Sequence, residues 1–235
     1  MKTFQDSGIV LKTIAAGESN KRVVLLLKEH GKVVVSAKGA QNAKSKLAAV
    51  TQPFACCEFK LYQGSGFLSL TQGSVIEGFH NISAELERFY AGCYMLELTD
   101  AVILPEMPAQ AALQLLYISL KKITAGTNHL LVRAVFEFKL LQYEGFEPIM
   151  EWCSCCNADP PLTHFGGNGA LCAACAAHHP ASPITAPCLE AIMHVLNSET
   201  KQLFSFNISD AIINELSAAA TVFRQSNIDV EFKSI

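Results

Sequence analysis

Residues 22–37 read RVVLLLKEHGKVVVSA, a pattern that predicts two antiparallel strands joined by a tight turn. The Val/Leu run at 22–27 is typical of a buried strand, and Val33, Val35 and Ala37 occupy every second position of the next strand. Gly31 lies in the turn between them, where glycine adopts a positive φ at little cost. The hairpin therefore predicts a β-rich region near the N-terminus.

Three further strand-like segments flank this hairpin. Residues 8–14 precede it, and residues 54–62 and 67–71 follow it, the last two joined by the turn sequence Gln-Gly-Ser-Gly. Five strands in under 75 residues fit a small barrel, and the five-stranded barrel that binds oligonucleotides is the OB-fold. Residues 38–50, rich in Lys, Ala and Ser, are expected to form a loop or a short helix on this barrel.

Apolar residues recur with a helical period from about Ser83, which is a suitable N-cap for a first helix that ends before Pro105. A second helix is expected from about Ala109, and a third from after Asn128 to Gly145. The rest of the chain predicts two more amphipathic helices, at 187–196 and 209–224, and a short tail at 230–235 that packs back on the body.

The composition is that of a folded protein. Of 235 residues, 17% are charged and 50% are hydrophobic, which is opposite to the balance in disordered chains. The most apolar segment, 91–104, is interrupted by Glu97 and Asp100, so it does not predict a membrane span. The first 30 residues carry charges such as Asp6 and Glu18 rather than a secretory signal, and we therefore expect a cytoplasmic protein.

The charge is divided unevenly along the chain. The formal net charge is −3, but residues 1–80 carry ten Lys or Arg and five Asp or Glu, which gives +5. The remainder carries eight bases and sixteen acids, which gives −8. This division favours a polyanion-binding module joined to a different region, although an ordinary solvated surface produces the same pattern.

Nine cysteines in a reducing compartment indicate metal ligands and buried thiols rather than disulfides. Four of them form two C-x-x-C knuckles, Cys153/Cys156 and Cys172/Cys175, separated by 15 residues. This spacing is typical of a zinc ribbon, and the turn residues between the knuckles fit a two-stranded excursion. We therefore predict one Zn²⁺ bound by four thiolates, with Cys155 as a neighbour that is not a ligand.

Four thiolates complete a tetrahedral site, which predicts a structural zinc rather than a catalytic one. The sequence carries neither a phosphate-binding P-loop nor a G-x-S-x-G elbow, and its acids form no evident pair. We therefore predict no catalytic residues and no enzyme activity. The remaining cysteines fall in strand or helix patterns and are expected to be buried thiols: Cys56, Cys57, Cys93 and Cys188.

Basic residues recur at strand ends and in loops, where a nucleic-acid-binding barrel would use them. Six of them are predicted to contact the phosphates of a nucleic acid: Lys21, Arg22, Lys32, Lys38, Lys44 and Lys46. Aromatic residues for base stacking are sparse in this region. Binding is therefore expected to depend on phosphates, to ignore base sequence and to weaken with salt.

Several motifs follow one another in a specific order. The N-terminal part contains GIVLKT at 8–13, EHGKVVVSAKGA at 29–40, KSKL at 44–47 and QPF at 52–54. Further on come FEFKLL at 136–141 with EGF at 144–146, then the two knuckles with paired glycines between them, then EFKSI at 231–235. In this order the chain resembles RecO, the recombination mediator family of bacterial DNA repair, in its zinc-bearing form.

The resemblance implies an OB-fold followed by a helical bundle with an embedded zinc knuckle. It also implies a protein that binds single- and double-stranded DNA and anneals complementary strands. Its implied partners are RecR, the C-terminal tail of single-stranded-DNA-binding protein (SSB) and, indirectly, the recombinase RecA, at the nucleoid during repair. The chain differs from the family at Gln41 and Asn42, where further bases are usual.

The acidic SSB tail requires a basic receptor, and the helical region has few clustered bases. Arg133 and Lys139 are our candidates for this contact. The predicted division of the chain is a barrel at 1–80, a first helical part at 81–150, a zinc-knuckle insertion at 151–182 and a second helical part at 183–235. Two alternative functions remain open: a zinc-ribbon protein–protein adaptor with incidental DNA binding, and a zinc-dependent hydrolase or nuclease.

Overall fold

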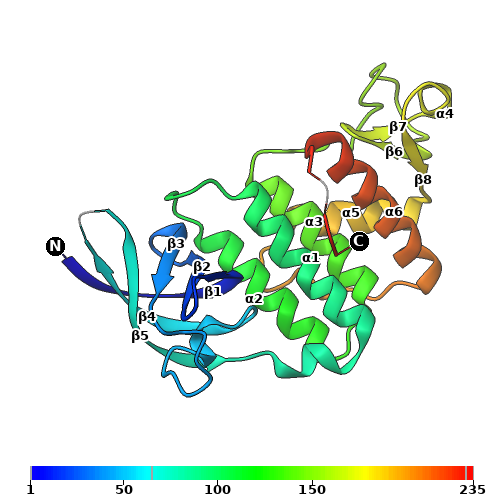
Figure 1. Ribbon diagram of the computed structural model, residues 1–235. Helices are drawn as coiled ribbons and strands as arrows, with labels where there is room; N and C mark the ends of the chain where they lie inside the picture. The colour runs from blue at the N-terminus through cyan, green and yellow to red at the C-terminus, as the bar shows by residue number, and fades with distance from the viewer. Residues whose placement is uncertain (1, 65, 231, 235) are drawn as a thin grey trace. The chain divides into compact units, whose positions relative to one another are not determined.

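The N-terminal strands form the closed five-stranded barrel that the sequence predicts (Figure 1). In this computed structural model, which describes residues 2–64, 66–230 and 232–234, the strand order is β1-β2-β3-β5-β4. β1 pairs with both β2 and β4, and a short parallel contact between β3 and β5 completes the OB-fold circuit. The strands are β1 (Lys2–Ala16), β2 (Asn20–Leu27), β3 (Gly31–Ala37), β4 (Cys56–Gln63) and β5 (Leu68–Glu77).

The barrel core consists of the apolar residues of alternating strand positions, such as Val23, Leu25 and Val35. Residues 38–48 form successive turns, followed by the short 3₁₀ helix η1 (Ala49–Thr51), as the Lys/Ala/Ser composition predicts. Val50 of η1 is buried in this core, so the segment is packed against the barrel.

β1 is longer than predicted because its polar first half is also a strand. Asp6 occupies an inward position, where only 7% of the residue is exposed. Its carboxylate accepts hydrogen bonds from the backbone N–H groups of Ser7, Glu29 and His30, and lies 2.7 Å from His30 Nδ1. A buried carboxylate is tolerated when such donors replace water. Asp6 therefore fixes the β2–β3 turn that Gly31 completes.

Gly31 is required by its surroundings as well as by its backbone conformation. Its φ is +64°, and a Cβ atom built there would lie 1.9 Å from the backbone oxygen of Met107. Gly17 has a similar φ of +69° but has no atom within 4 Å of the same position. Substitutions at these two glycines therefore separate the free-energy cost of the left-handed backbone conformation from that of the clash with Met107.

We predict that Gly31→Ala destabilises the protein much more than Gly17→Ala. The left-handed conformation alone should cost about 1 kcal/mol in either variant, and the clash should add about 2 kcal/mol at Gly31. Urea denaturation of both variants measures the difference in the free energy of unfolding. Equal losses would contradict the close packing of Gly31 against Met107.

Helices α1 (Leu86–Val102) and α2 (Gln110–Thr124) belong to the same compact unit as the barrel. The predicted N-cap at Ser83 is wrong, because Ser83 lies in the 3₁₀ helix η2 (His80–Ala84) and its hydroxyl donates to the carbonyl of His80. Glu85 is extended, so α1 begins only at Leu86.

The tail returns to α1, as predicted, over the part of it that is described. The Phe232 ring contacts Tyr94 at 5.2 Å between centroids. The backbone N–H groups of Lys233 and Ser234 donate to Glu97 Oε2 at 3.0 and 3.3 Å. Residues 231 and 235 of the predicted tail lie outside the described residues. This unit, unit 1, comprises Met1–Thr124 and Phe232–Ile235.

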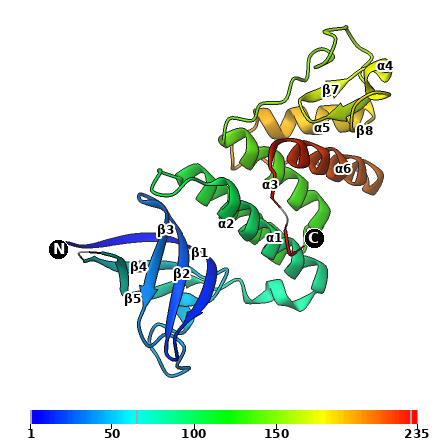
Figure 2. The same cartoon turned by 45° about the horizontal axis from the view of Figure 1, so that its top comes forward.

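Unit 2 comprises Ala125–Glu231 and contains three long helices with a small sheet at one end of them (Figure 2). Asn128 caps the first of these helices, since its side chain accepts from the N–H groups of Leu130 and Leu131. The elements of unit 2 are α3 (His129–Tyr143), β6 (His164–Gly166), β7 (Gly169–Leu171), α4 (Ala173–Ala176), β8 (Ala181–Pro183), α5 (Ala186–Asn197) and α6 (Asp210–Asn227).

Three aromatic side chains hold the small sheet on the helices of unit 2. Phe165 of β6 meets Phe138 of α3 at 5.4 Å and 90°, and Phe138 stacks on Phe223 of α6 at 5.5 Å. All three rings are fully or almost fully buried. Burial of such large rings fixes the position of the sheet, and with it the cysteine knuckles that flank β6 and β7. No helix in the described part of the chain combines the length and apolarity that a membrane crossing needs.

Candidate metal centre and nucleic-acid interface

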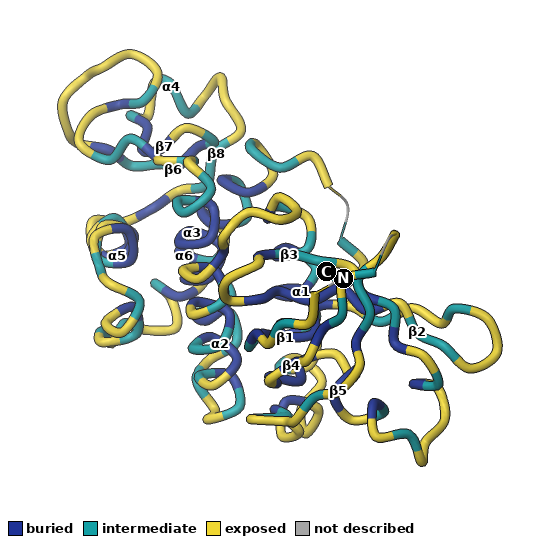
Figure 3. The backbone as a smooth tube through the Cα atoms, turned by 90° about the vertical axis from the view of Figure 1, so that its left-hand side faces the viewer, coloured by how far each residue is buried: buried dark blue, intermediate teal, exposed yellow. Residues whose placement is uncertain are grey.

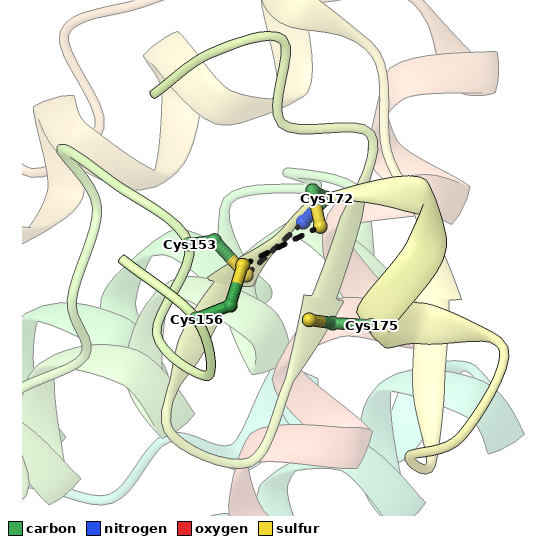
Figure 4. Close-up of side chains that lie close together, drawn as sticks. All are labelled: Cys153, Cys156, Cys172 and Cys175. Atoms are coloured by element: carbon green, nitrogen blue, oxygen red, sulfur yellow. Dashed lines mark hydrogen bonds between the residues drawn. The ribbon is translucent and has the colours of Figure 1, made fainter. Parts of the chain in front are cut away.

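The two knuckles bring four thiols together, as their spacing predicts (Figure 4). The Sγ atoms of Cys153, Cys156, Cys172 and Cys175 all lie within 4.8 Å of one another. Cys153 is fully buried, whereas Cys156 is exposed. The loops around α4 are mostly exposed (Figure 3). The cluster therefore has one side in the protein core and one side near solvent.

The backbone around the first knuckle is shaped by Asn157. Its φ is +59°, a conformation that Asn adopts more readily than most residues, and its N–H donates to the Cys153 carbonyl at 2.9 Å. Between the knuckles, β6 and β7 form the predicted two-stranded excursion. β8 adds a third strand that the sequence did not indicate. The hairpin returns the chain so that the second knuckle faces the first.

Hydrogen bonds to sulfur prepare Cys153 to carry negative charge. Burial raises the pKa of this thiol, but N–H groups of Cys172, Cys156 and Cys155 outweigh burial and lower the pKa to about 6. The Cys172 N–H lies 3.4 Å from the Cys153 sulfur. Hydrogen bonds with the neighbouring thiols Cys156 and Cys172 instead raise the pKa of Cys175. Only a cation would allow all four sulfurs to be thiolates at once.

The donor set fits Zn²⁺. Zinc–sulfur bonds of about 2.3 Å in a tetrahedron place sulfurs about 3.8 Å apart. The Cys156 and Cys172 sulfurs are already 3.9 Å apart. N–H groups that donate to the ligand sulfurs are the outer-shell contacts expected of such a site. The four cysteines could thus hold a metal ion without rearrangement of the fold.

Cys155 lies beside this cluster but not in it. Its side chain is exposed, and its sulfur is 3.3 Å from His179 Nε2. Of the other cysteines, Cys56, Cys57 and Cys188 are buried as predicted, and burial raises their pKa values to about 11, 12 and 12. Cys93 is only half-buried, because its position on α1 is at the edge of the buried face.

The bases of the barrel gather around one anchored loop. The loop after β3 is tied to the β1–β2 turn by the amide of Gln41, which donates to the carbonyls of Gly17 and Asn20 at 2.9 and 2.8 Å. The Asn20 side chain accepts from the Gly39 N–H in return. This contact holds Lys38 beside the start of β2, where Ala37 pairs with Lys21.

Five of the six predicted nucleic-acid contacts lie in this loop or at the start of β2, to which the loop is tied. Arg22, Lys38, Lys44 and Lys46 are exposed. Lys21 is half-buried, with its ammonium 3.3 Å from Thr51 Oγ1 of η1. We name this group of five bases the loop surface: Lys21, Arg22, Lys38, Lys44 and Lys46.

Lys32 is held away from the loop surface. Only 14% of its side chain is exposed, and its ammonium donates to the backbone oxygen of Asp100 and lies 3.5 Å from Asp100 Oδ1. The backbone of Lys32 also accepts from Glu106. Lys32 therefore ties β3 to the end of α1.

The two candidate tail contacts also have internal partners. Arg133 Nε lies 2.8 Å from Glu137 Oε1, one turn along α3. Lys139 is 5% exposed, and its ammonium donates to the Leu196 carbonyl and to Gln142 at 2.8 and 2.9 Å. Burial lowers the pKa of Lys139. Arg133 is thus the more accessible of the pair.

Comparison with known proteins gives a consistent result. The family models described as Recombination protein O N terminal and C terminal match residues 1–79 and 83–234. A DNA repair protein RecO from Acetivibrio thermocellus is 30% identical over 240 residues, covering 100% of this chain and 96% of its own length. The chain belongs to the RecO family. A RecO from Shouchella clausii is 34% identical over 187 residues, with 78% of this chain and 73% of its own covered.

RecO membership gives the chain a role in DNA repair and recombination. The two RecO models meet between residues 79 and 83, whereas spatial contacts group α1 and α2 with the barrel. The domain boundary at residue 80 therefore stays a prediction.

One base of the barrel, Lys12, was not among the predicted nucleic-acid contacts. Lys12 is exposed on β1, two residues before Ile14, which pairs directly with Arg22. All three side chains accordingly face the same side of the sheet. Alternation along β1 was the available signal, but the bulge between Val10 and Lys12 interrupts it.

Lys32 gives a test that distinguishes a DNA contact from a structural one. We predict that Lys32→Ala keeps the affinity for a single-stranded oligonucleotide within about twofold, because no phosphate contact is lost. The same variant should lose about 1–2 kcal/mol of stability, since Asp100 loses its donor. Fluorescence anisotropy and urea denaturation measure the two effects. A large loss of affinity with unchanged stability would indicate that Lys32 contacts DNA after all.

Proposed function

We propose that this chain is a non-enzymatic repair mediator that binds single- and double-stranded DNA and anneals complementary strands. The family supports this proposal through its name and its established role in repair. The proposed partners are RecR, the SSB tail and, through them, the recombinase RecA on SSB-coated DNA. The proposed compartment is the cytoplasm, at the nucleoid during repair.

The loop surface is the observation that carries DNA binding. Its five bases belong to strand ends and loops whose backbone is fixed by Gln41 and Asn20. Lysine and arginine side chains that are held in place lower the repulsion between two phosphate backbones, and they do so without ATP. They leave the edges of the nucleobases free to pair, because contacts with phosphates do not read the nucleotide sequence. Lys12 extends this surface along β1.

Zinc is proposed as a structural ion. Bound to the four cysteines, it would cross-link the two knuckles across the β6–β7 hairpin. The chain's own residues would hold it through four sulfurs and the N–H groups that point at them. The SSB tail contact is proposed at Arg133, with Lys139 contributing charge from beneath the surface.

Strand annealing across a salt series tests the proposal. Complementary oligonucleotides, one coated with SSB, should anneal faster with the protein than without it. With four or five phosphates contacted on a single strand, log affinity should fall with log salt at a slope of about −3 to −3.5. Absence of annealing on both bare and coated DNA would contradict the proposed function.

A further inference from the structure

A groove in unit 2 is lined by side chains that neither the metal centre nor the loop surface uses. The segment that leads into the first knuckle forms one wall, and the last turns of α5 form the other. The groove encloses about 360 Å³. Its apolar lining includes Pro148, Met150, Trp152, Met193 and Leu196.

Both walls are held in place by hydrogen bonds. The N–H of Ile149 donates to Asn168 at 3.0 Å, and its carbonyl accepts from Ala170 at 2.8 Å, so this wall is joined to β7. On the other wall, the Leu196 carbonyl accepts from the buried ammonium of Lys139. A groove with fixed walls needs little reorganisation to receive a ligand.

The apolar side chains of the groove are unusually open to solvent. Trp152 is 41% exposed and Met193 is 38% exposed. Tryptophan is enriched at the energetic centres of protein interfaces, and methionine adapts its shape to different partners. Large exposed apolar side chains gathered in a hollow mark an interaction site.

The charge of the groove selects the kind of partner. Among the described residues that line it, the ionisable ones are Glu147 and Glu151, and both are acidic. An acidic segment such as the SSB tail would be repelled there, whereas Lys or Arg on a partner would be attracted. The groove is thus distinct from the tail contact proposed at Arg133.

We propose that this groove docks a short segment of a partner protein that carries apolar side chains flanked by Lys or Arg. The apolar side chains lie between Trp152 and Met193, and the bases reach Glu147 and Glu151. Trp152 immediately precedes Cys153, a member of the thiol cluster, so this wall is continuous with the candidate metal centre.

The test begins with a phage-displayed library of random dodecapeptides selected on the whole protein. The chain has a single tryptophan, so Trp152 emission reports on the groove directly. Selected peptides should be net positive with two or more apolar residues. A synthetic copy of one, free of tryptophan and tyrosine, should shift Trp152 emission to shorter wavelength on binding.

Variants assign the binding to the groove. Met193→Ser should weaken the peptide about tenfold, and the double variant Glu147→Gln/Glu151→Gln about fivefold at 0.1 M salt. The charge-matched control Glu190→Gln/Glu199→Gln alters two exposed acids outside the lining and should change affinity less than about twofold. The proposal is overturned if no peptide is enriched, if acidic peptides are enriched, or if the groove variants bind as well as the control.

Discussion

Cys153→Ser is expected to reduce the zinc content from one ion per chain to none and to unfold the knuckle region. Cys153 is the fully buried member of the cluster, and its sulfur accepts several backbone N–H groups. Structural zinc contributes about 10–16 kcal/mol of apparent binding free energy in zinc-finger peptides, so the loss of stability should exceed about 4 kcal/mol. Elemental analysis and thermal unfolding measure the two effects.

Cys155→Ser is the matched control, since it alters an exposed thiol in the same knuckle. It keeps the N–H at position 155 that points at the Cys153 sulfur. This variant should retain zinc, and its free energy of unfolding should lie within about 0.5 kcal/mol of that of the natural protein. In hydrogen-exchange measurements, the Ala170 amide should lose its protection in Cys153→Ser and keep it in Cys155→Ser. Equal zinc loss in both variants would mean that Cys155 is a ligand.

Reversal of Lys38, Lys44 and Lys46 to Glu should abolish most DNA binding and annealing. Three phosphate contacts would be replaced by repulsion, so we expect affinity for single-stranded DNA to fall more than about a hundredfold at 0.1 M salt. The loop itself should keep its position, because it is held by Gln41 and Asn20 rather than by these lysines. Anisotropy and annealing assays measure the change.

A control of equal charge separates the loop surface from net charge. Lys60, Lys201 and Lys233 are exposed and lie outside this surface. Their reversal to Glu also changes the formal net charge from −3 to −9. The control should lose less than about tenfold in affinity, through long-range repulsion alone. If both triple variants lose the same affinity, DNA is not bound at the loop surface.

Local patterns predicted the barrel and the cysteine cluster because both depend on spacing along the chain. Alternating Val and Leu residues specify the strands of the hairpin, and the two C-x-x-C pairs specify the ligands. Asn128 was recognisable as a boundary because its side chain caps α3 within three residues. Signals of this kind are contained within one element or one turn.

Features that depend on distant partners were not predictable. In the sequence, Lys32 resembles a surface base, because the Asp100 carbonyl that accepts from its ammonium is 68 positions away. In the sequence, Lys139 resembles a solvated charge, because the Leu196 carbonyl that accepts from its ammonium is 57 positions away. The first half of β1 escaped notice because a buried Asp6 contradicts the expected alternation, and only the N–H groups of the β2–β3 turn explain it.

The contact between the tail and α1 has a consequence for synthesis. The contacts of Tyr94 with Phe232 and of Glu97 with Lys233 form only after the whole of unit 2 has been translated. Unit 1 is therefore the first part of the chain to begin folding and the last to finish. A nascent chain arrested before residue 232 would present an incomplete α1 surface to chaperones and proteases, however well its barrel had formed.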